Sequence, residues 1–231
     1  RGAILGLAAR RAEALQALAA GLGTPCHLYP LDVADAAALA AAGTDFIAQA
    51  GVPDIVIANA GVSVGTLTEE ADDLPAFRRV LDVNVMGMVQ TFQPFVTGMR
   101  VARRGRLVGI ASIAGIRGLP GAGAYSASKA AAIAYLESLR VELRGSGVKV
   151  VTLAPGYIAT AMTAKNPYPM PFLMPVDKAV LSMAGHIDKG SRFAVMPWQM
   201  GLVAAVMKLL PRPVYDLLFA RAGRKPRGLP P

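Results

Sequence analysis

Short apolar runs and longer helix-like stretches alternate along most of the chain. The predicted strands are residues 3–9, 27–31, 55–58, 107–110 and 148–153. The predicted helices are residues 12–20, 34–49, 72–103 and an Ala-rich stretch over 125–145. Strands that are apolar almost throughout are typical of a parallel sheet covered by helices on both faces. The pattern therefore predicts an α/β, doubly wound fold.

Polar or turn-forming residues follow several of the predicted strands. Asn59, Ser112 and Pro155 each come at or just after the end of such a strand. In an open parallel sheet, ligands bind beyond the carboxyl ends of the strands. We therefore expect these residues to share one ligand site.

The composition is that of one compact domain. The 231 residues are 54% hydrophobic, which is enough for one sizeable core, and no internal repeat is present. We place the main domain over residues 1–195 and an apolar, basic extension over residues 196–231. The single cysteine, Cys26, excludes an internal disulfide, and no secretory leader appears, which favours a cytoplasmic setting.

Tyr125 and Lys129 stand four residues apart in the Ala-rich stretch. Helical geometry places positions i and i+4 on one face, so the ammonium can lie beside the phenol. A nearby positive charge favours the phenolate and lowers the pKa of the tyrosine, which would let it exchange a proton near neutral pH. The alternative is an ordinary helix surface on which the lysine is solvated.

The surroundings of this pair favour a functional reading. Ser112 ends an apolar run upstream, and Asn84 lies in the sequence Asp-Val-Asn-Val. In this order and spacing the motifs resemble the short-chain dehydrogenase/reductase family over roughly residues 1–165. The resemblance implies a single Rossmann-like domain and a catalytic set formed by Asn84, Ser112, Tyr125 and Lys129.

The resemblance also implies a reaction. A hydride would pass between a nicotinamide and a carbonyl or secondary alcohol, while Tyr125 exchanges the proton. Ser112 would hydrogen-bond the same oxygen, and Lys129 would lower the pKa of the tyrosine and bind ribose hydroxyls. Asn84 would hold a water that links Lys129 to solvent. We expect no metal.

The end of the first predicted strand indicates the cofactor. The family's NAD-preferring branch carries an acidic residue there, whereas this chain has Ala9 followed by Arg10 and Arg11. A guanidinium binds a 2′-phosphate through charge-assisted hydrogen bonds, which a carboxylate would repel. NADP(H) is therefore preferred over NAD(H), with Arg10 as the phosphate contact. The alternative is that both arginines begin a solvated helix.

Further cofactor contacts follow from the resemblance. They are the adenine-contacting pair Asp32 and Val33, the ribose turn Asn59, Ala60 and Gly61, and the nicotinamide-side residues Pro155, Gly156, Ile158 and Thr160. Asp32 has a competing explanation, because a carboxylate at this position could cap the helix expected to begin near Ala34.

One expected motif is missing. A dinucleotide fingerprint needs a Gly-rich turn between a first strand and a first helix. The chain begins instead with a run that matches the family's second strand, and the glycines of residues 118–123 follow the Ser112 loop. We therefore expect the first strand and helix to be missing, and the sequence to be a fragment of a longer protein.

The substrate is indicated only by class. Flexible thioethers and aromatics beside a catalytic cleft favour an apolar substrate, although the same residues could form core or subunit contacts. These residues are Met162, Tyr168, Met170, Phe172, Leu173, Met174, Met183, Phe193, Met196 and Trp198.

The tail combines apolar and basic residues, and the formal net charge of the chain is +9. An amphipathic basic helix could lie on an anionic membrane surface, with subunit packing as the competing explanation. No recognition motif for nucleic acid accompanies the charge. The helices over residues 85–103 and 125–144 resemble those through which family members form homodimers or homotetramers.

Two classes of function remain open from the sequence. One is an NADP(H)-dependent oxidoreductase acting on an apolar carbonyl or alcohol. The other is a cofactor-sensing or membrane-docking protein that keeps the fold without turnover. The complete set Asn84, Ser112, Tyr125 and Lys129 argues for the enzyme.

Overall fold

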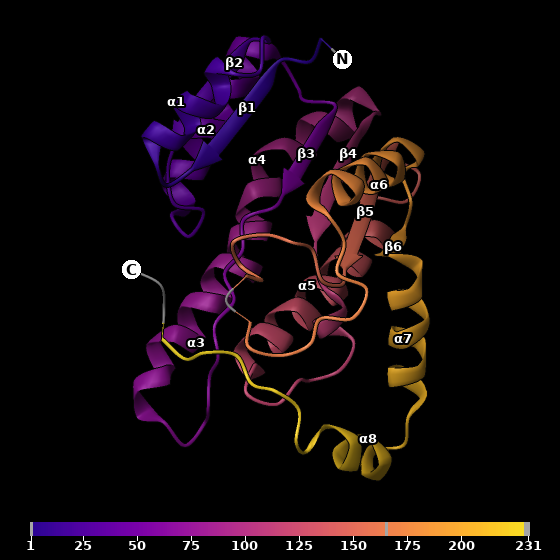
Figure 1. The fold of residues 1–231 in the computed structure, drawn as a ribbon. Helices are drawn as coiled ribbons and strands as arrows, with labels where there is room; N and C mark the ends of the chain where they lie inside the picture. Colours follow the sequence, from indigo (N-terminus) through magenta and orange to yellow (C-terminus); the bar gives the residue numbers. More distant parts are fainter. Residues whose placement is uncertain (1, 165, 229–231) are drawn as a thin grey trace.

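A computed structural model describes residues 2–164 and 166–228 of the chain, and its ribbon is drawn in Figure 1. The strands are β1 (Leu5–Ala9), β2 (Cys26–Pro30), β3 (Ile55–Ala58), β4 (Gly105–Ile110), β5 (Val148–Pro155) and β6 (Phe193–Met196). The α-helices are α1 (Ala12–Ala20), α2 (Ala36–Ala50), α3 (Leu74–Leu81), α4 (Gly87–Ala102), α5 (Gly123–Glu142), α6 (Val176–Lys189), α7 (Trp198–Leu209) and α8 (Arg212–Phe219). The predicted α/β fold is confirmed.

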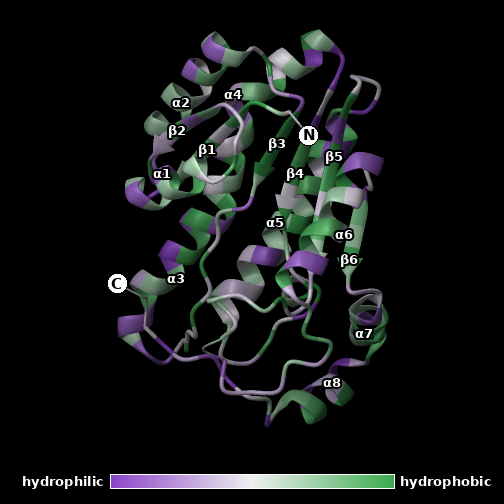
Figure 2. Ribbon diagram, turned by 45° about the horizontal axis from the view of Figure 1, so that its top comes forward, coloured by the Kyte–Doolittle hydropathy of each residue, from purple (hydrophilic) through white to green (hydrophobic). Residues whose placement is uncertain are grey.

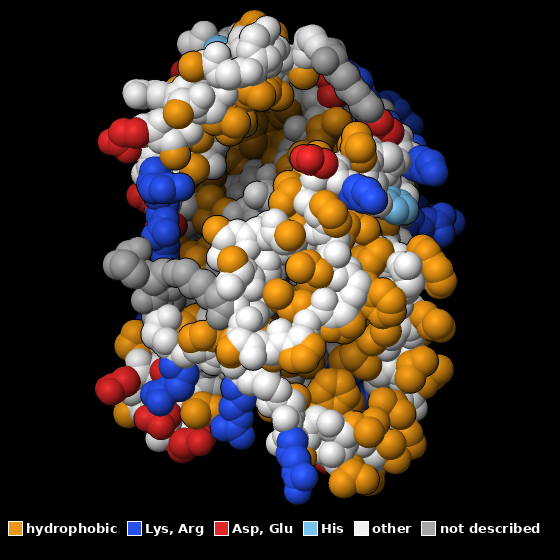
Figure 3. All heavy atoms as spheres, in the orientation of Figure 1, with side chains coloured by type: hydrophobic (Ala, Val, Ile, Leu, Met, Phe, Trp, Pro, Cys, Tyr) orange, Lys and Arg blue, Asp and Glu red, His pale blue; other side chains and the backbone are white. Residues whose placement is uncertain are grey.

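The strands form two separate parallel sheets. β1 pairs with β2, and the larger sheet has the order β3-β4-β5-β6. In the doubly wound strand order, the first strand lies between the second and the fourth, which is where this split falls. No strand among the described residues occupies that position. The facing edges of β1 and β3 are therefore unpaired with each other, and the molecular surface is hollowed between the two units (Figure 3).

Packing of α2 on α4 holds the N-terminal unit to the rest of the molecule. A Cβ on Gly43 would lie 2.5 Å from Pro94 Cβ, so the two helix backbones approach closely only because this residue is glycine. The rings of Phe46 and Phe95 meet edge to face at 6.4 Å between centroids. This contact positions β1 and β2 without hydrogen bonds to the larger sheet.

The core lies on both faces of the larger sheet. Leu107 packs with α4 and α5 on one face, whereas Val108 packs with α6 on the other. Successive strand residues point to opposite faces, and both of these side chains are fully buried. Figure 2 shows the corresponding green strands at the centre of the molecule. Each such side chain stabilises the fold by about 1.5–3 kcal/mol.

The helix predicted over residues 72–103 contains an irregular turn. The chain forms a short 3₁₀ turn, Ala71–Asp73 (η1), then α3, then a π-helical segment, Asp82–Met86 (η2), and then α4. A π segment inside a helix is uncommon and is often associated with a functional site. Here it contains Asn84.

The C-terminal extension is mostly helical and carries apolar and basic residues. It contains α7 and α8 at an angle, followed by an extended segment that returns toward α3 (Figure 1). Apolar side chains on the two helices remain exposed, among them Trp198, Leu209 and Leu217 (Figure 3). Within residues 2–164 and 166–228, every helix is too short or too polar to cross a bilayer.

Candidate active site

Ser112 and Tyr125 come together beyond the carboxyl end of β4. Ser112 precedes the 3₁₀ turn Ile113–Gly115 (η3), and its Oγ accepts a hydrogen bond of 3.2 Å from the Ala114 amide. Tyr125 lies in the first turn of α5, and its phenol is near enough to the Ser112 side chain for that hydroxyl to lower the pKa of the phenol. Two hydroxyl groups therefore lie near each other, as is needed for both to bind a single carbonyl oxygen.

The pKa of Tyr125 shifts in the direction opposite to the one expected from the sequence. Burial raises the pKa of its phenol above the ordinary value, and the nearby Ser112 hydroxyl only partly opposes this. The ammonium of Lys129 lies 5.8 Å from the ring centroid. At that separation it does not offset the burial of the phenol, so in the protein alone Tyr125 is a protonated acid at neutral pH.

Lys129 is buried, and its Nζ donates a hydrogen bond of 2.7 Å to the carbonyl oxygen of Ile110 at the end of β4. Burial lowers the pKa of its ammonium to about 8. The charge is therefore still present at neutral pH, within reach of the site that Ser112 and Tyr125 face.

Asn84 is almost completely buried in the π segment and bridges two parts of the site. Its Oδ1 accepts from the Val62 amide at 2.8 Å, and its Nδ2 donates to the Val62 carbonyl oxygen and to Ser128 Oγ, both at 2.9 Å. Ser128 in turn donates to the Tyr125 carbonyl oxygen at 2.7 Å. Asn84 thus connects the loop after β3 to the helix that carries Tyr125.

Two glycines are required by the close packing of this half of the site. A Cβ on Gly61 would lie 3.3 Å from Asn84 Oδ1 and 3.7 Å from Lys129 Nζ, so both side chains converge on this turn. A Cβ on Gly115 would lie 2.6 Å from the backbone carbonyl carbon of Lys129. Any side chain there would displace α5.

The predicted nucleoside contacts lie on the N-terminal unit. Arg10 and Arg11 are exposed just after β1, and Arg11 is the residue before α1. Asp32 follows β2 and forms an ion pair with Arg79 of α3. Burial alone would raise the pKa of Asp32, but the Ala34 amide and the guanidinium groups of Arg79 and Arg10 hold that pKa below its usual value.

The structure rejects the capping explanation for Asp32. The helix α2 begins at Ala36, and its N-cap is Asp35, whose carboxylate accepts from the Ala38 amide at 3.0 Å. Asp32 instead closes a local turn with the Ala34 amide at 2.9 Å. The cap comes later because the chain uses Asp32 to turn away from β2. The neighbouring Val33 packs against the position where Gly87 has no side chain.

The predicted nicotinamide-side residues follow β5. Pro155 is buried at its end, and Gly156 donates a backbone hydrogen bond of 2.8 Å to the carbonyl oxygen of Met196. A Cβ on Gly156 would lie 2.7 Å from the side chain of Met200, so α7 requires a small residue here. Ile158 forms a single bridge with the segment around Met174. Thr160 is exposed.

The ribose turn of Asn59, Ala60 and Gly61 connects the two groups of residues, directly after β3. Asn59 and Ala60 are exposed at this edge. The sequence-predicted residues therefore line one edge, with the predicted catalytic set on the larger sheet and the predicted phosphate contact on the smaller one.

Sequence reasoning missed a second lysine at the site. Lys225 Nζ lies 5.3 Å from the centroid of the Tyr125 ring, and it donates a hydrogen bond of 2.6 Å to Ser63 Oγ. The two partners are 162 positions apart in the chain. No local pattern connects them, because the contact exists only once the tail has folded back.

Comparisons with known proteins agree with this geometry. The pattern of the short chain dehydrogenase family matches residues 1–169. An uncharacterized oxidoreductase of Myxococcus xanthus is 41% identical over 224 residues, covering 96% of this chain and 88% of the relative. The 2-dehydro-3-deoxy-L-rhamnonate dehydrogenase (NAD(+)) of a Sphingomonas species is 42% identical over 129 residues, which is 56% of this chain and 52% of that protein.

Solved structures have the same fold. A 3-oxoacyl-[acyl-carrier protein] reductase of Brucella melitensis superposes with a TM-score of 0.73 at 30% identity, over 85% of this chain and 81% of that one. A structure of such a reductase from the same organism with bound NAD gives a TM-score of 0.71 at 30% identity, over 85% and 80% of the two chains. The chain belongs to the short-chain dehydrogenase family of oxidoreductases, whose cofactors are nicotinamide dinucleotides.

Proposed function

We propose that the chain is an NADP(H)-dependent reductase or dehydrogenase that interconverts a carbonyl and a secondary alcohol on an apolar substrate, with Tyr125 as the proton donor and acceptor. The observation that carries the proposal is the proximity of the Ser112 and Tyr125 hydroxyl groups, with the buried ammonium of Lys129 5.8 Å from the Tyr125 ring. The pair is positioned at a strand end, where an open parallel sheet binds its ligand.

The residues present fit a nicotinamide dinucleotide along this edge. A Cβ on Gly61 would lie 3.3 Å from Asn84 Oδ1 and 3.7 Å from Lys129 Nζ, so glycine keeps this turn free of a side chain that would crowd both groups. Arg10 and Asp32 would hold the nucleoside end, and Lys129 would bind ribose hydroxyls near the reacting end. When bound, the nicotinamide supplies the hydride.

Each side chain then has a separate role in handling the proton. The phenol of Tyr125 is protonated at neutral pH because burial raises its pKa, so it can donate to a carbonyl oxygen during reduction. Ser112 donates to the same oxygen and stabilises the developing negative charge. Asn84 fixes the loop after β3 and would hold the water that returns a proton to Lys129.

Preference for NADP(H) rests on Arg10. Its guanidinium is exposed just beyond β1 and close enough to Asp32 to lower the pKa of that carboxyl. A 2′-phosphate offers the bidentate anion that a guanidinium binds best. Since one relative is named as NAD(+)-dependent and one neighbouring structure contains NAD, the choice needs a direct measurement.

An apolar substrate is supported by side chains around the loop that follows β5. Met162, Phe172 and Leu173 are each about half exposed there, at 45%, 50% and 44%. Exposed thioether, aromatic and aliphatic side chains on a loop that follows a strand end are typical of the lining of a site for an apolar ligand. The name of the Brucella reductase specifies a 3-oxoacyl substrate, in which a carbonyl group is part of an acyl chain.

The proposal is tested by a screen of ketones and secondary alcohols with NADPH or NADP⁺, comparing wild type with Tyr125→Phe. We expect kcat to fall by about 10³-fold, within the range for loss of a general acid, while NADPH binding is retained. Tyr135→Phe is the matched control, because Tyr135 lies on the same helix and packs into the core. Turnover by Tyr125→Phe at the wild-type rate would refute the proposed role.

We also propose that residues 1–195 bind the cofactor and catalyse the reaction in a homo-oligomer, and that the extension docks on an anionic membrane surface. The extension carries exposed apolar residues, Trp198 at 74% and Leu209 at 82%, beside the exposed cations Lys208 and Arg212. Co-sedimentation with anionic and neutral vesicles at low and high salt tests the docking. Absence of binding to anionic vesicles at low salt would refute the docking and would favour subunit packing through the exposed apolar residues of the extension.

A further inference from the structure

The segment after α8 folds back across the candidate site. We call residues 220–228 the strap. The amide of Gly65 donates a hydrogen bond of 2.8 Å to the carbonyl oxygen of Pro226, and Gly65 forms a β-bridge with Arg227. A Cβ on Gly65 would lie 2.3 Å from the carbonyl oxygen of Lys225, so the strap lies directly on this loop. Figure 1 shows it in yellow, running beside α3.

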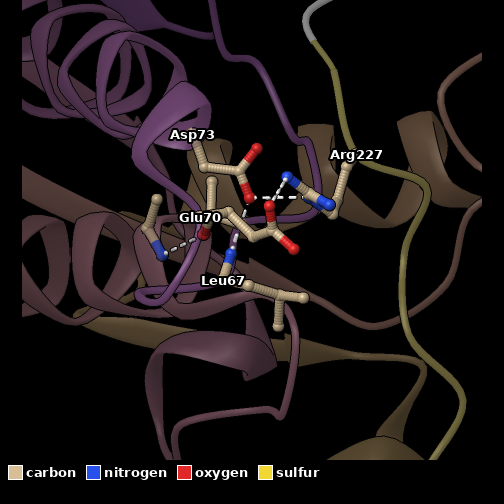
Figure 4. Close-up of polar contacts among 6 residues, drawn as sticks. Leu67, Glu70, Asp73 and Arg227 are labelled. Atoms are coloured by element: carbon tan, nitrogen blue, oxygen red, sulfur yellow. Dashed lines mark hydrogen bonds and ion pairs between the residues drawn. The ribbon is translucent and has the colours of Figure 1, made fainter.

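Arg227 anchors the strap through two carboxylates. Its guanidinium lies 2.9 Å from Asp73 and 3.0 Å from Glu70 (Figure 4). Asp73 is buried and also accepts from the Leu67 amide at 2.8 Å. The hydrogen bond from Arg227 holds the pKa of Asp73 below its usual value, so the carboxylate is charged at neutral pH. These ion pairs therefore fix the strap on the C-terminal side of Lys225.

The other side of Lys225 is held by packing. A Cβ on Gly223 would lie 2.6 Å from Tyr168 Cβ, and the stem of Arg224 covers Gly121 just before α5. Burial and then the nearby Tyr157 and Tyr125 raise the pKa of Tyr168 to about 12. The strap thus forms one wall of the space around Tyr125.

Lys225 is the residue of the strap whose ammonium lies near Tyr125. Its ammonium is partly buried and can donate three hydrogen bonds, of which Ser63 accepts one. The Tyr125 ring, at 5.3 Å, adds a weak cation–π contact. None of the ion pairs found among residues 2–164 and 166–228 includes Lys225. Arg227, two positions on, has two carboxylates.

A partly buried ammonium without a counter-charge is unfavourable, and a bound anion would neutralise it. We propose that Lys225 binds a carboxylate or phosphate group of the substrate, close to the carbonyl that Tyr125 protonates. The inference rests on the proposed function for the position of that carbonyl. It narrows the substrate to an anionic carbonyl compound with an apolar body, such as an oxo acid.

The experiment compares matched pairs of an oxo acid and its methyl ester, with the full chain and NADPH. Wild type should favour the acid in kcat/KM, and Lys225→Met should lower the ratio of acid to ester by about 10- to 100-fold, the range for a lost hydrogen bond to a charged group. Lys225→Arg should keep most of the preference. Arg221→Met removes the same charge from an exposed position at the start of the strap and should leave the ratio unchanged.

A second measurement separates failure of this inference from failure of the proposed reaction. Binding of the corresponding hydroxy acid is measured by calorimetry in Tyr125→Phe, with and without Lys225→Met. Loss of binding with Lys225→Met supports the anion site even if turnover is absent. Equal use of acid and ester by wild type overturns it while the reductase proposal stands. A change in NADPH affinity alone upon Lys225→Met would also overturn it, because the cation would then serve the cofactor.

Discussion

The half of the site proposed for catalysis lies on the larger sheet and is made of buried side chains. The residue proposed to select the cofactor, Arg10, lies on the N-terminal unit and is exposed. Asn84 and Lys129 are each buried to 5% exposure or less, and their polar atoms have protein partners. Arg10, by contrast, extends from the end of β1 into solvent. The difference indicates that substitutions in the first half change stability and catalysis together, while those in the second change ligand preference alone.

Asn84→Ala should have the largest effect on stability. The substitution removes the partner of the amide and carbonyl groups of Val62, and it removes the donor to the Ser128 hydroxyl, which keeps only its own bond to the Tyr125 carbonyl oxygen. We expect the free energy of unfolding to fall by about 2–4 kcal/mol, as for loss of a buried hydrogen-bond network. Urea denaturation measures it. Asn59→Ala, at an exposed position, is the control and should lower the free energy of unfolding by less than about 0.5 kcal/mol. An equal loss of unfolding free energy in both variants would contradict the difference between the buried and exposed halves of the site.

Gly115→Ala should combine a smaller loss of stability with a loss of activity. The new Cβ would meet the backbone of Lys129 at 2.6 Å, which cannot rotate away as a side chain can. We expect a cost of about 1–3 kcal/mol. A shift of α5 of about 1 Å would lower kcat by up to about 100-fold. Gly118→Ala, in the same loop, is the control, because nothing lies within 4 Å of its new Cβ. Wild-type stability and kcat in Gly115→Ala, as expected for Gly118→Ala, would contradict the close packing of Gly115 on α5.

Lys129 should give the buried half a distinct dependence of stability on pH. Its folded pKa of about 8 lies below the value of 10.5 in the unfolded chain, so the unfolded state binds more protons between these values. The contribution of Lys129 to stability therefore rises from pH 8 to pH 10 and is lost as the pH falls through 8.

Denaturation of wild type and Lys129→Met at pH 7 and pH 9.5 measures this contribution. The variant should lack the gain at the higher pH. Lys149→Met is the control, since Lys149 is exposed on β5 and should retain the wild-type dependence. Identical pH curves for wild type and Lys129→Met would mean that the ammonium is hydrated rather than buried.

Arg10→Asp should have the smallest effect on the fold and a selective effect on the cofactor. Replacing an exposed cation leaves packing intact, so the unfolding free energy should change by less than about 0.5 kcal/mol. The ratio of kcat/KM for NADPH to that for NADH should fall by about 10- to 100-fold, because a charge-assisted contact is replaced by repulsion. Arg11→Asp tests which of the two exposed arginines binds the phosphate, and it should lower this ratio less than Arg10→Asp does. An unchanged ratio in Arg10→Asp would remove Arg10 from the cofactor site.

Several features could be predicted from the sequence because they are local. The apolar strands and Ala-rich helix follow from side-chain periodicity, and the structure confirms them within a few residues at each end. The spacing of Tyr125 and Lys129 places both on α5 for the same reason. Local spacing did not show the π turn at Asn84, since a single extra residue in a helix leaves no mark on a short periodic pattern.

Electrostatic direction was less predictable than position. The sequence suggested that a neighbouring ammonium would lower the pKa of Tyr125, but burial raises it. Burial depends on everything packed around the phenol, including the strap and the loop with Tyr168, and none of that is near it in sequence. Asp32 gives a second case, since its ion pair with Arg79 joins residues from two separate helix–strand units.

The sequence by itself determined the strand–helix alternation, the membership of the short-chain dehydrogenase family and the order of the residues proposed for catalysis. These depend on local periodicity and on motifs whose residues lie close together in the chain. Only the tertiary structure decided that the sheet is divided between β1 and β3, and that Lys225 reaches Tyr125. Both depend on contacts between distant segments, whose energies arise only when the chain is compact and water is excluded from between them.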